Sequence, residues 1–98
     1  MAAIQIVRFK LNTGVDVKEF TALDERFQRE VAPQLAGLER REATIGADGE
    51  WVLVLRYHDV DAAKMAGKSD ASDLSKKFMT MIDMKTMSAS FFDIVSEG

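Results

Sequence analysis

The side chains best suited to chemistry are consecutive: Arg56, Tyr57 and His58. His58 is the only histidine, and an imidazole can act as a general base near neutral pH. Tyr57 could orient a phenolic ligand, and Arg56 could bind a carboxylate. Each also has a structural alternative: a half-exposed strand end for His58, a packed ring for Tyr57, and an ion pair with Asp59 or Asp93 for Arg56. No nucleophile stands out as a partner for a catalytic triad, so the sequence predicts none. Arg56, Tyr57 and His58 are kept as candidate catalytic residues on their side-chain chemistry alone.

Methionines form the second unusual feature, since four of the six fall close together near the C-terminus. A Cu(I) site would need their sulfur atoms to converge on one point. On a helical wheel Phe78, Met81 and Ile82 share one side, whereas Met79 and Met84 lie on opposite flanks of it. The sulfurs therefore diverge, and we predict no metal site. Methionine fills irregular apolar gaps, which favours core or dimer packing, with a flexible wall for an apolar ligand as the alternative.

Length and composition limit the remaining possibilities. The 98 residues predict one domain spanning 1–98, and 47% of them are apolar. The absence of cysteine excludes disulfides, thiolate zinc sites and a cysteine nucleophile. Thirteen basic and sixteen acidic residues are interspersed, as in residues 24–26 and 39–42, which predicts a solvated surface and no nucleic-acid partner. No long apolar segment or leader is apparent, so we expect a cytoplasmic protein with no membrane partner.

Periodicity in the first half predicts a strand, a helix and a second strand. Residues 4–11 alternate, and Asp16 followed by Glu19 indicates a helix start. Apolar side chains then recur at steps of three and four, and Pro33 should end the regular helix nearby. These apolar side chains are Phe20, Leu23, Phe27, Val31 and Leu35. Residues 38–45 are rich in charge, which favours an edge strand.

The second half predicts a central strand, helical segments and a last strand. Residues 51–58 are largely apolar on both faces, as expected of a central strand. Asp59 or Asp61 should cap a short helix that runs through Ala66 and ends at Gly67. A polar break over residues 68–72, a helix over 73–83 and a strand over 87–95 complete the chain. The order β-α-β-β-α-β predicts a ferredoxin-like α+β fold, an antiparallel sheet with helices on one face.

The predicted sheet carries too much apolar surface for a single subunit. Its first, third and fourth strands bear large apolar residues on both faces, whereas two helices can cover only one face. An uncovered face would present a large apolar patch to water, which monomers rarely tolerate. A second copy packed sheet against sheet is the simplest cover, so we predict a homodimer.

Four short patterns are shared with one superfamily and extend over nearly the whole chain. They are residues 8–11 with Gly14, the helix start Glu19-Phe20, Gly37-Leu38 with Arg41, and residues 54–59 before the second helical segment. With these patterns the chain resembles the dimeric α/β-barrel superfamily, and especially its antibiotic-biosynthesis-monooxygenase-like branch. They describe an architecture, and none of them is a catalytic signature.

The resemblance implies a ligand pocket inside each subunit, between sheet and helices. Some members oxidise polycyclic aromatic substrates without a metal or organic cofactor, others degrade haem, and others have no known reaction. The haem-degrading branch uses an asparagine where this chain has Val7, and a histidine that residues 65–83 lack, so we expect no haem and no other cofactor. We predict that a small apolar or aromatic molecule binds this pocket, with cofactor-independent monooxygenation as the enzymatic form and a non-catalytic binding or assembly module as the alternative. The candidate pocket residues are Val7, Phe9, Phe27, Phe78, Met81 and Met84.

Other folds share the same order of elements but lack their signatures here. Residues 51–58 do not carry the basic and aromatic pattern of an RNA-recognition motif. The turn over residues 12–15 has no arginine of the kind that acylphosphatases use to bind phosphate. Heavy-metal-associated domains need paired cysteines, which are absent.

Overall fold

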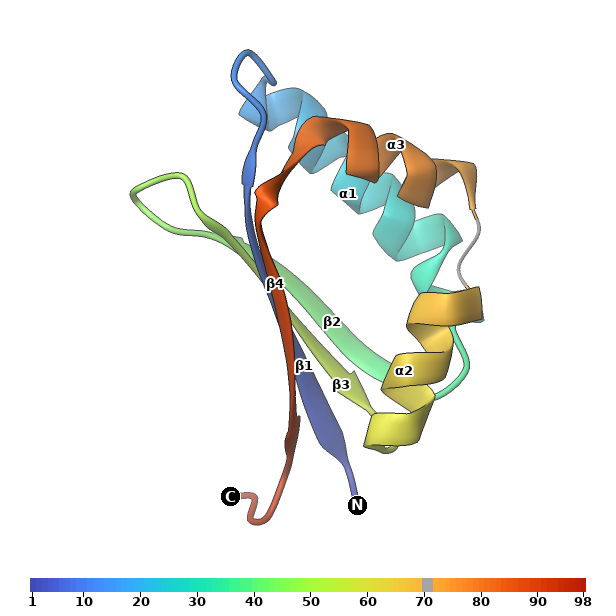
Figure 1. The fold of residues 1–98 in the computed structure, drawn as a ribbon. Helices are drawn as coiled ribbons and strands as arrows, with labels where there is room; N and C mark the ends of the chain where they lie inside the picture. Colours follow the sequence, from blue (N-terminus) through green and yellow to red (C-terminus); the bar gives the residue numbers. More distant parts are fainter. Residues whose placement is uncertain (70–71) are drawn as a thin grey trace.

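The computed structural model describes residues 1–69 and 72–98, in which a four-stranded antiparallel sheet carries its helices on one face (Figure 1). The strand order is β2-β3-β1-β4, so β2 is an edge strand and β3 an internal one, as predicted. This arrangement confirms the ferredoxin-like α+β fold class. The elements are β1 (Ala3–Leu11), α1 (Val17–Glu30), the 3₁₀ turn η1 (Ala32–Gln34), β2 (Leu38–Ile45), β3 (Trp51–Tyr57), α2 (Val60–Ser69), α3 (Asp73–Met81) and β4 (Ile82–Asp93).

Local capping accounts for where the helices begin. The Asp16 carboxylate accepts a hydrogen bond from the Lys18 backbone N–H at 2.9 Å, which fixes the start of α1. Asp59, and not Asp61, caps α2 by accepting from the Ala62 N–H at 2.7 Å. As predicted, α1 ends just before Pro33, which lies in η1.

The predicted boundaries in the second half need correction. Helix α2 continues past Gly67 to Ser69, because an internal glycine weakens a helix by only about 1 kcal/mol and does not by itself end it. The predicted break over residues 68–72 is shorter, since Lys68 belongs to α2 and Ser72 caps α3; residues 70–71 of that break lie outside the described residues.

Helix α3 ends at Met81 and β4 starts at once at Ile82, earlier than the predicted 87. The end of β1 holds this junction. The Asn12 side chain donates to the carbonyls of Thr80 and Ile82 at 3.1 and 3.3 Å, and its backbone N–H donates to Met81 O at 2.8 Å. These long-range bonds draw the chain into the sheet directly after the helix, which local sequence cannot reveal.

The two faces of the sheet differ in what covers them. One face packs under the helices, and none of the helices in the described part of the chain lies over the other (Figure 1). The uncovered face is apolar at its centre, with Phe92 52% exposed. By strand alternation its central residues are Ile4, Ile6, Val52, Val54 and Phe92. This confirms that the sheet is apolar on both sides.

Ion pairs border the uncovered face. Arg56 contacts Glu39 at 3.2 Å and Glu97 at 2.6 Å, and these bonds, first to Glu97 and then to Glu39, raise its pKa above the ordinary arginine value. The predicted partners Asp59 and Asp93 are wrong. The Asp59 carboxylate is used in capping α2, and Asp93 pairs with Ala3 and so shares the opposite face.

The core beneath the helices consists of two clusters. The first, here the aromatic cluster, includes the five buried rings Phe9, Phe20, Phe27, Trp51 and Phe78. Most neighbouring rings meet edge to face, with centroids 4.9 Å apart for Phe20 and Trp51, 5.0 Å for Phe20 and Phe78, and 5.2 Å for Phe27 and Phe78. Phe9 and Trp51 instead stack face to face, with centroids 6.4 Å apart. The second, here the α2 cluster, is formed by Leu55, Tyr57, Ala63 and Ala66.

A buried ion pair joins α1 to the edge strand β2. The Arg41 guanidinium donates to both carboxylate oxygens of Asp24, at 2.6 and 3.2 Å, and to Gln28 Oε1 at 3.2 Å. It also lies over the Phe27 ring, 4.7 Å from the centroid. The Arg41 side chain is only 3% exposed. The prediction of a solvated surface is therefore wrong for Asp24 and Arg41, which find each other only in the folded chain.

Gly37 allows the close approach of α2 to the turn before β2. Its φ is +81°, and an added Cβ would lie 2.7 Å from the Ala62 Cβ. Its carbonyl accepts from the His58 backbone N–H at 2.8 Å. Both the backbone conformation and the packing therefore require glycine here.

We expect Gly37→Ala to lower the free energy of unfolding by about 2–4 kcal/mol, from positive-φ strain together with steric overlap. Gly14→Ala is the matched control, because Gly14 has a φ of +88° with nothing within 4 Å of its added Cβ. It should cost only about 1–2 kcal/mol of strain. Urea unfolding measures both, and equal losses would contradict the steric part.

We expect Asp24→Ala to lower the free energy of unfolding by about 3–5 kcal/mol, because it leaves the Arg41 charge buried without its carboxylate. Replacing both partners, in Asp24→Leu with Arg41→Met, should recover much of this loss. The control is Glu30→Ala, which breaks the exposed Arg26–Glu30 pair and should change stability little. A negligible effect of Asp24→Ala in urea unfolding would contradict the burial of this pair.

Candidate functional site

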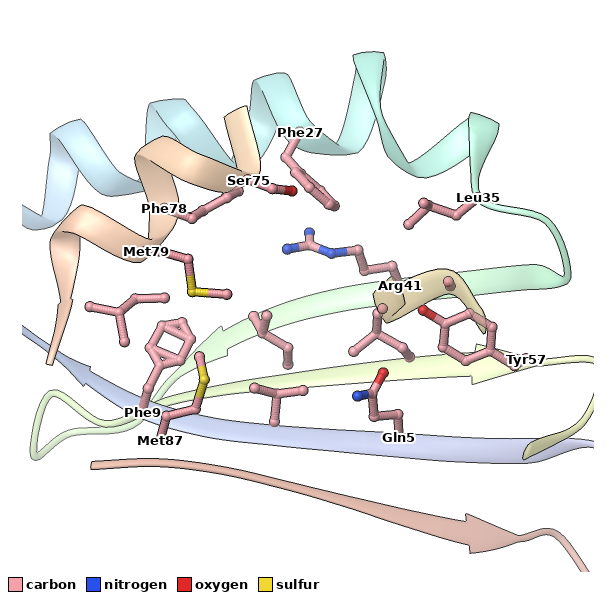
Figure 2. Close-up of a pocket in the computed structure, with 16 residues that line it drawn as sticks. Gln5, Phe9, Phe27, Leu35, Arg41, Tyr57, Ser75, Phe78, Met79 and Met87 are labelled. Atoms are coloured by element: carbon pink, nitrogen blue, oxygen red, sulfur yellow. The ribbon is translucent and has the colours of Figure 1, made fainter. Parts of the chain in front are cut away.

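A cavity of about 230 Å³ lies between the two clusters of the core, under α1 and α3 and above the sheet (Figure 2). It is bounded by Phe9, Phe27 and Phe78 of the aromatic cluster and by Leu55 and Tyr57 of the α2 cluster. The cavity is open to solvent on one side and lies where the two clusters of the core meet.

One half of the cavity wall is apolar and soft. Met79 of α3 and Met87 of β4 point toward each other beside Phe9 and Phe78 (Figure 2). Thioether side chains are flexible and polarisable and make favourable contacts with aromatic rings. This half can adapt to a flat apolar group.

The other half carries the polar groups. Gln5 of β1 and Tyr57 of β3 rise from the sheet, and Arg41 extends beneath Phe27 (Figure 2). Ser75 of α3 adds a hydroxyl close to Phe27. The Arg41 charge is already balanced by Asp24, so the polar half offers hydrogen-bonding groups with no uncompensated charge.

Four of the six predicted pocket residues line this cavity: Val7, Phe9, Phe27 and Phe78. Met81 and Met84 do not. Met81 packs beside the aromatic cluster, and Met84 is 52% exposed on β4. The helical wheel fails for Met84 because α3 has already ended at Met81. Met79 and Met87 supply the thioethers in their place. A ligand-binding role for all these residues stays a prediction.

The consecutive candidates Arg56, Tyr57 and His58 do not gather at one site. Strand alternation sends Arg56 to the uncovered face, and Tyr57, 2% exposed, to the cavity wall. His58 is exposed just after β3 ends and does not line the cavity. Tyr57 is thus the one member of the three that a bound molecule in the cavity could touch.

Gln5 and Arg41 are cavity residues that sequence reasoning missed. Gln5 carried a signal, since it is the one polar residue on a strand face formed otherwise by Ala3, Val7 and Phe9. Arg41 entered the sequence analysis only as part of the Gly37-Leu38 pattern, and nothing within its strand marked it as a cavity residue, because β2 is rich in charge and its buried arginine resembles its exposed neighbours.

Arg41 also separates the cavity from a shallow groove of about 570 Å³ on the outer side of α1 and β2. Trp51 lines this groove, and within the described part of the chain its buried Nε1 has no hydrogen-bond partner. Asp24, Gln28 and Arg29 give the groove a mixed charge.

Two negative findings hold for residues 1–69 and 72–98. No group of three or more histidine, aspartate or glutamate side chains is placed to hold a metal ion. No helix there has both the length and the apolarity that a bilayer span requires.

The sequence matches no protein-family profile and no curated protein. Solved structures, by contrast, resemble the chain over nearly its whole length. Rv0793 from Mycobacterium tuberculosis has a TM-score of 0.74 at 17% identity, covering 99% of this chain and 98% of that one. SnoaB, a cofactor-independent oxygenase from Streptomyces nogalater, has a TM-score of 0.75 at 16% identity, covering 98% and 95%.

A dimeric protein of unknown function with a ferredoxin-like fold, from Bacteroides fragilis, has a TM-score of 0.67 at 13% identity, covering 95% of this chain and 96% of that one. Likeness at these identities is a likeness of fold. It confirms the architecture expected from the resemblance to the antibiotic-biosynthesis-monooxygenase-like branch: the chain has the ferredoxin-like fold that these proteins share.

Proposed function

We propose that the protein is a homodimer in which each subunit binds an apolar or aromatic small molecule in the cavity between sheet and helices. The observation that carries the proposal is the cavity itself, bounded mainly by aliphatic, aromatic and thioether side chains with a few polar groups at one end. That composition is typical of small-molecule sites.

The size of the cavity narrows the ligand class. Its 230 Å³ is below the roughly 300 Å³ at which sites for drug-sized ligands begin. It exceeds the roughly 150 Å³ of an engineered cavity that binds benzene, which favours a ligand of about one or two fused rings.

The uncovered sheet face supports the homodimer. Its apolar centre is bordered by paired positive and negative side chains, such as Arg56 with Glu39 and Arg8 with Glu50. Such a surface can pair with a second copy through a twofold axis, apolar centre on apolar centre. The dimeric Bacteroides fragilis protein of similar fold is consistent with this assembly.

Cofactor-independent oxygenation is the second candidate, favoured by the fold shared with SnoaB. Without a cofactor, the substrate itself must supply the electrons that reduce oxygen. In a balanced form, an activated methylene R₂CH₂ and O₂ give the ketone R₂C=O and one water. Within the cavity, the Tyr57 side chain is the proposed orienting group for such an electron-rich aromatic substrate.

Val7→Phe should abolish ligand binding while the chain stays folded, because the added ring fills the cavity from β1. With 2-naphthol in excess, the wild-type protein should show a higher thermal midpoint, since a ligand that binds only the folded state stabilises it. Val7→Phe should show no such rise. An equal rise in this variant would contradict binding in this cavity.

Val54→Arg should dissociate the dimer, because it places a charge at the apolar centre of the uncovered face. Sedimentation at micromolar concentration should give twice the 10.9-kDa chain mass for the wild type and the single mass for the variant. Val7→Phe is the control and should remain dimeric, since Val7 lies on the other face. A wild-type protein at the single mass would refute the proposed assembly.

If the protein is an oxygenase, hydroxylated one- or two-ring aromatics should cause oxygen uptake with a matching oxygenated product by mass spectrometry. Tyr57→Phe should slow this uptake by about tenfold, as expected for loss of roughly 1.4 kcal/mol of orientation in the transition state. His58→Ala should leave the rate unchanged, because His58 is exposed outside the cavity. Binding without uptake would favour a non-catalytic binder.

A further inference from the structure

We infer that Gln5 selects the ligand, by hydrogen bonding through its side-chain amide to a carbonyl or hydroxyl group on an uncharged aromatic molecule. This inference rests on the proposed function, since it requires a ligand in the cavity. The cavity wall favours a ligand with an apolar ring, and this inference specifies the polar group that the ring should carry.

Gln5 is the one polar side chain on the face of β1 that lies under the helices, and it is partly buried. It lies in the middle of β1, opposite Leu55 on β3 and Phe91 on β4. On the same face of β1, its neighbours are Ala3 and Val7.

The three glutamines of the chain differ in their hydrogen bonds. Gln28 accepts from Arg41 at 3.2 Å, and Gln34 donates to the Glu30 carbonyl at 2.8 Å. The Gln5 amide makes no hydrogen bond to any described residue, and Figure 2 shows it pointing into the cavity. Two glutamines therefore hold the fold together, and the third is directed at the space that a ligand would occupy.

The amide of Gln5 can bond a ligand directly. Gln5 is only partly buried, and among the described residues its amide is not one of the buried polar atoms that lack a partner, so water can serve it while the cavity holds no ligand. A ligand that displaces this water must offer an oxygen to the amide, because an amide left unpaired beneath a ligand would cost about 1–3 kcal/mol. Because an amide both donates and accepts, a carbonyl and a hydroxyl are equally suitable.

Charge limits the class further. Arg41 is the one charged residue among the described residues that line the cavity, and Asp24 and Gln28 already occupy its guanidinium. A charged ligand would therefore be buried without an opposite charge, which is unfavourable. The expected ligand is neutral, with its ring between Phe9 and Met87 and its oxygen toward Gln5.

The test compares three naphthalene derivatives that differ at one substituent: 2-naphthol, naphthalene and 2-naphthoate at pH 7. Wild-type protein should bind 2-naphthol about tenfold more tightly than naphthalene, the ratio for one hydrogen bond of about 1.4 kcal/mol. It should bind anionic 2-naphthoate at least about tenfold more weakly than 2-naphthol. NMR titration of the Met87 methyl signal measures affinity at the cavity wall, and Met79, which is 51% exposed, gives a second signal.

Gln5→Leu should remove the preference for 2-naphthol while leaving naphthalene affinity equal or higher. Gln34→Leu makes the same chemical change outside the cavity and should preserve the preference. Circular dichroism checks that both variants fold, and Gln5→Asn offers a second variant with a shorter amide that should weaken the preference without abolishing it.

The outcomes separate this inference from the proposed function. If Gln5→Leu binds 2-naphthol and naphthalene with the same ratio of affinities as the wild type, the role proposed for Gln5 is wrong and the cavity remains a binding site. If 2-naphthoate binds most tightly, Arg41 is the recognition group and the inference is overturned. If none of the three probes shifts the methionine signals of the wild type, the inference and the proposed ligand site fail together.

Discussion

The division of the core into two clusters is the constraint on which the rest of this structure depends. Five aromatic rings hold α1 and α3 at a fixed height above one end of the sheet, with neighbouring centroids about 5 Å apart. At the other end the small side chains of Ala63 and Ala66 let α2 approach the sheet closely. The helices therefore lie at different distances from the sheet at its two ends. The side chains of the two clusters do not fill the space between them, so a cavity remains where the clusters meet.

The ion pair between Asp24 and Arg41 closes one side of that cavity. A buried pair of this kind contributes little net stability, because desolvation offsets the attraction between the charges. Its effect here is geometric: two bonds from a planar guanidinium hold α1 against the edge strand and separate the cavity from the outer groove. It also leaves the polar end of the cavity without net charge, which is the setting in which a neutral amide such as Gln5 can discriminate between ligands.

The candidate site shows how far local sequence reasoning reaches. Alternation put Val7 and Phe9 on one face of the first strand, and the step of three and four put Phe27 on the apolar side of the first helix, because these periods follow directly from backbone geometry. The sequence did not say which face of the sheet lies under the helices. The same reasoning failed at Met84, since it needed the residue at which α3 ends. That residue is set by hydrogen bonds from Asn12, about seventy positions earlier in the chain.

By itself, the sequence determined the first three strands, the first helix, the edge position of β2 and the excess of apolar surface on the sheet. All of these depend on patterns within a few residues or on a count of faces. Only the tertiary structure decided that Arg56, Tyr57 and His58 lie at three different places, that Arg41 is buried against Asp24, and that Gln5 faces the cavity. These outcomes depend on how far apart the elements settle, and that distance is set by the packing of rings contributed by four separate segments.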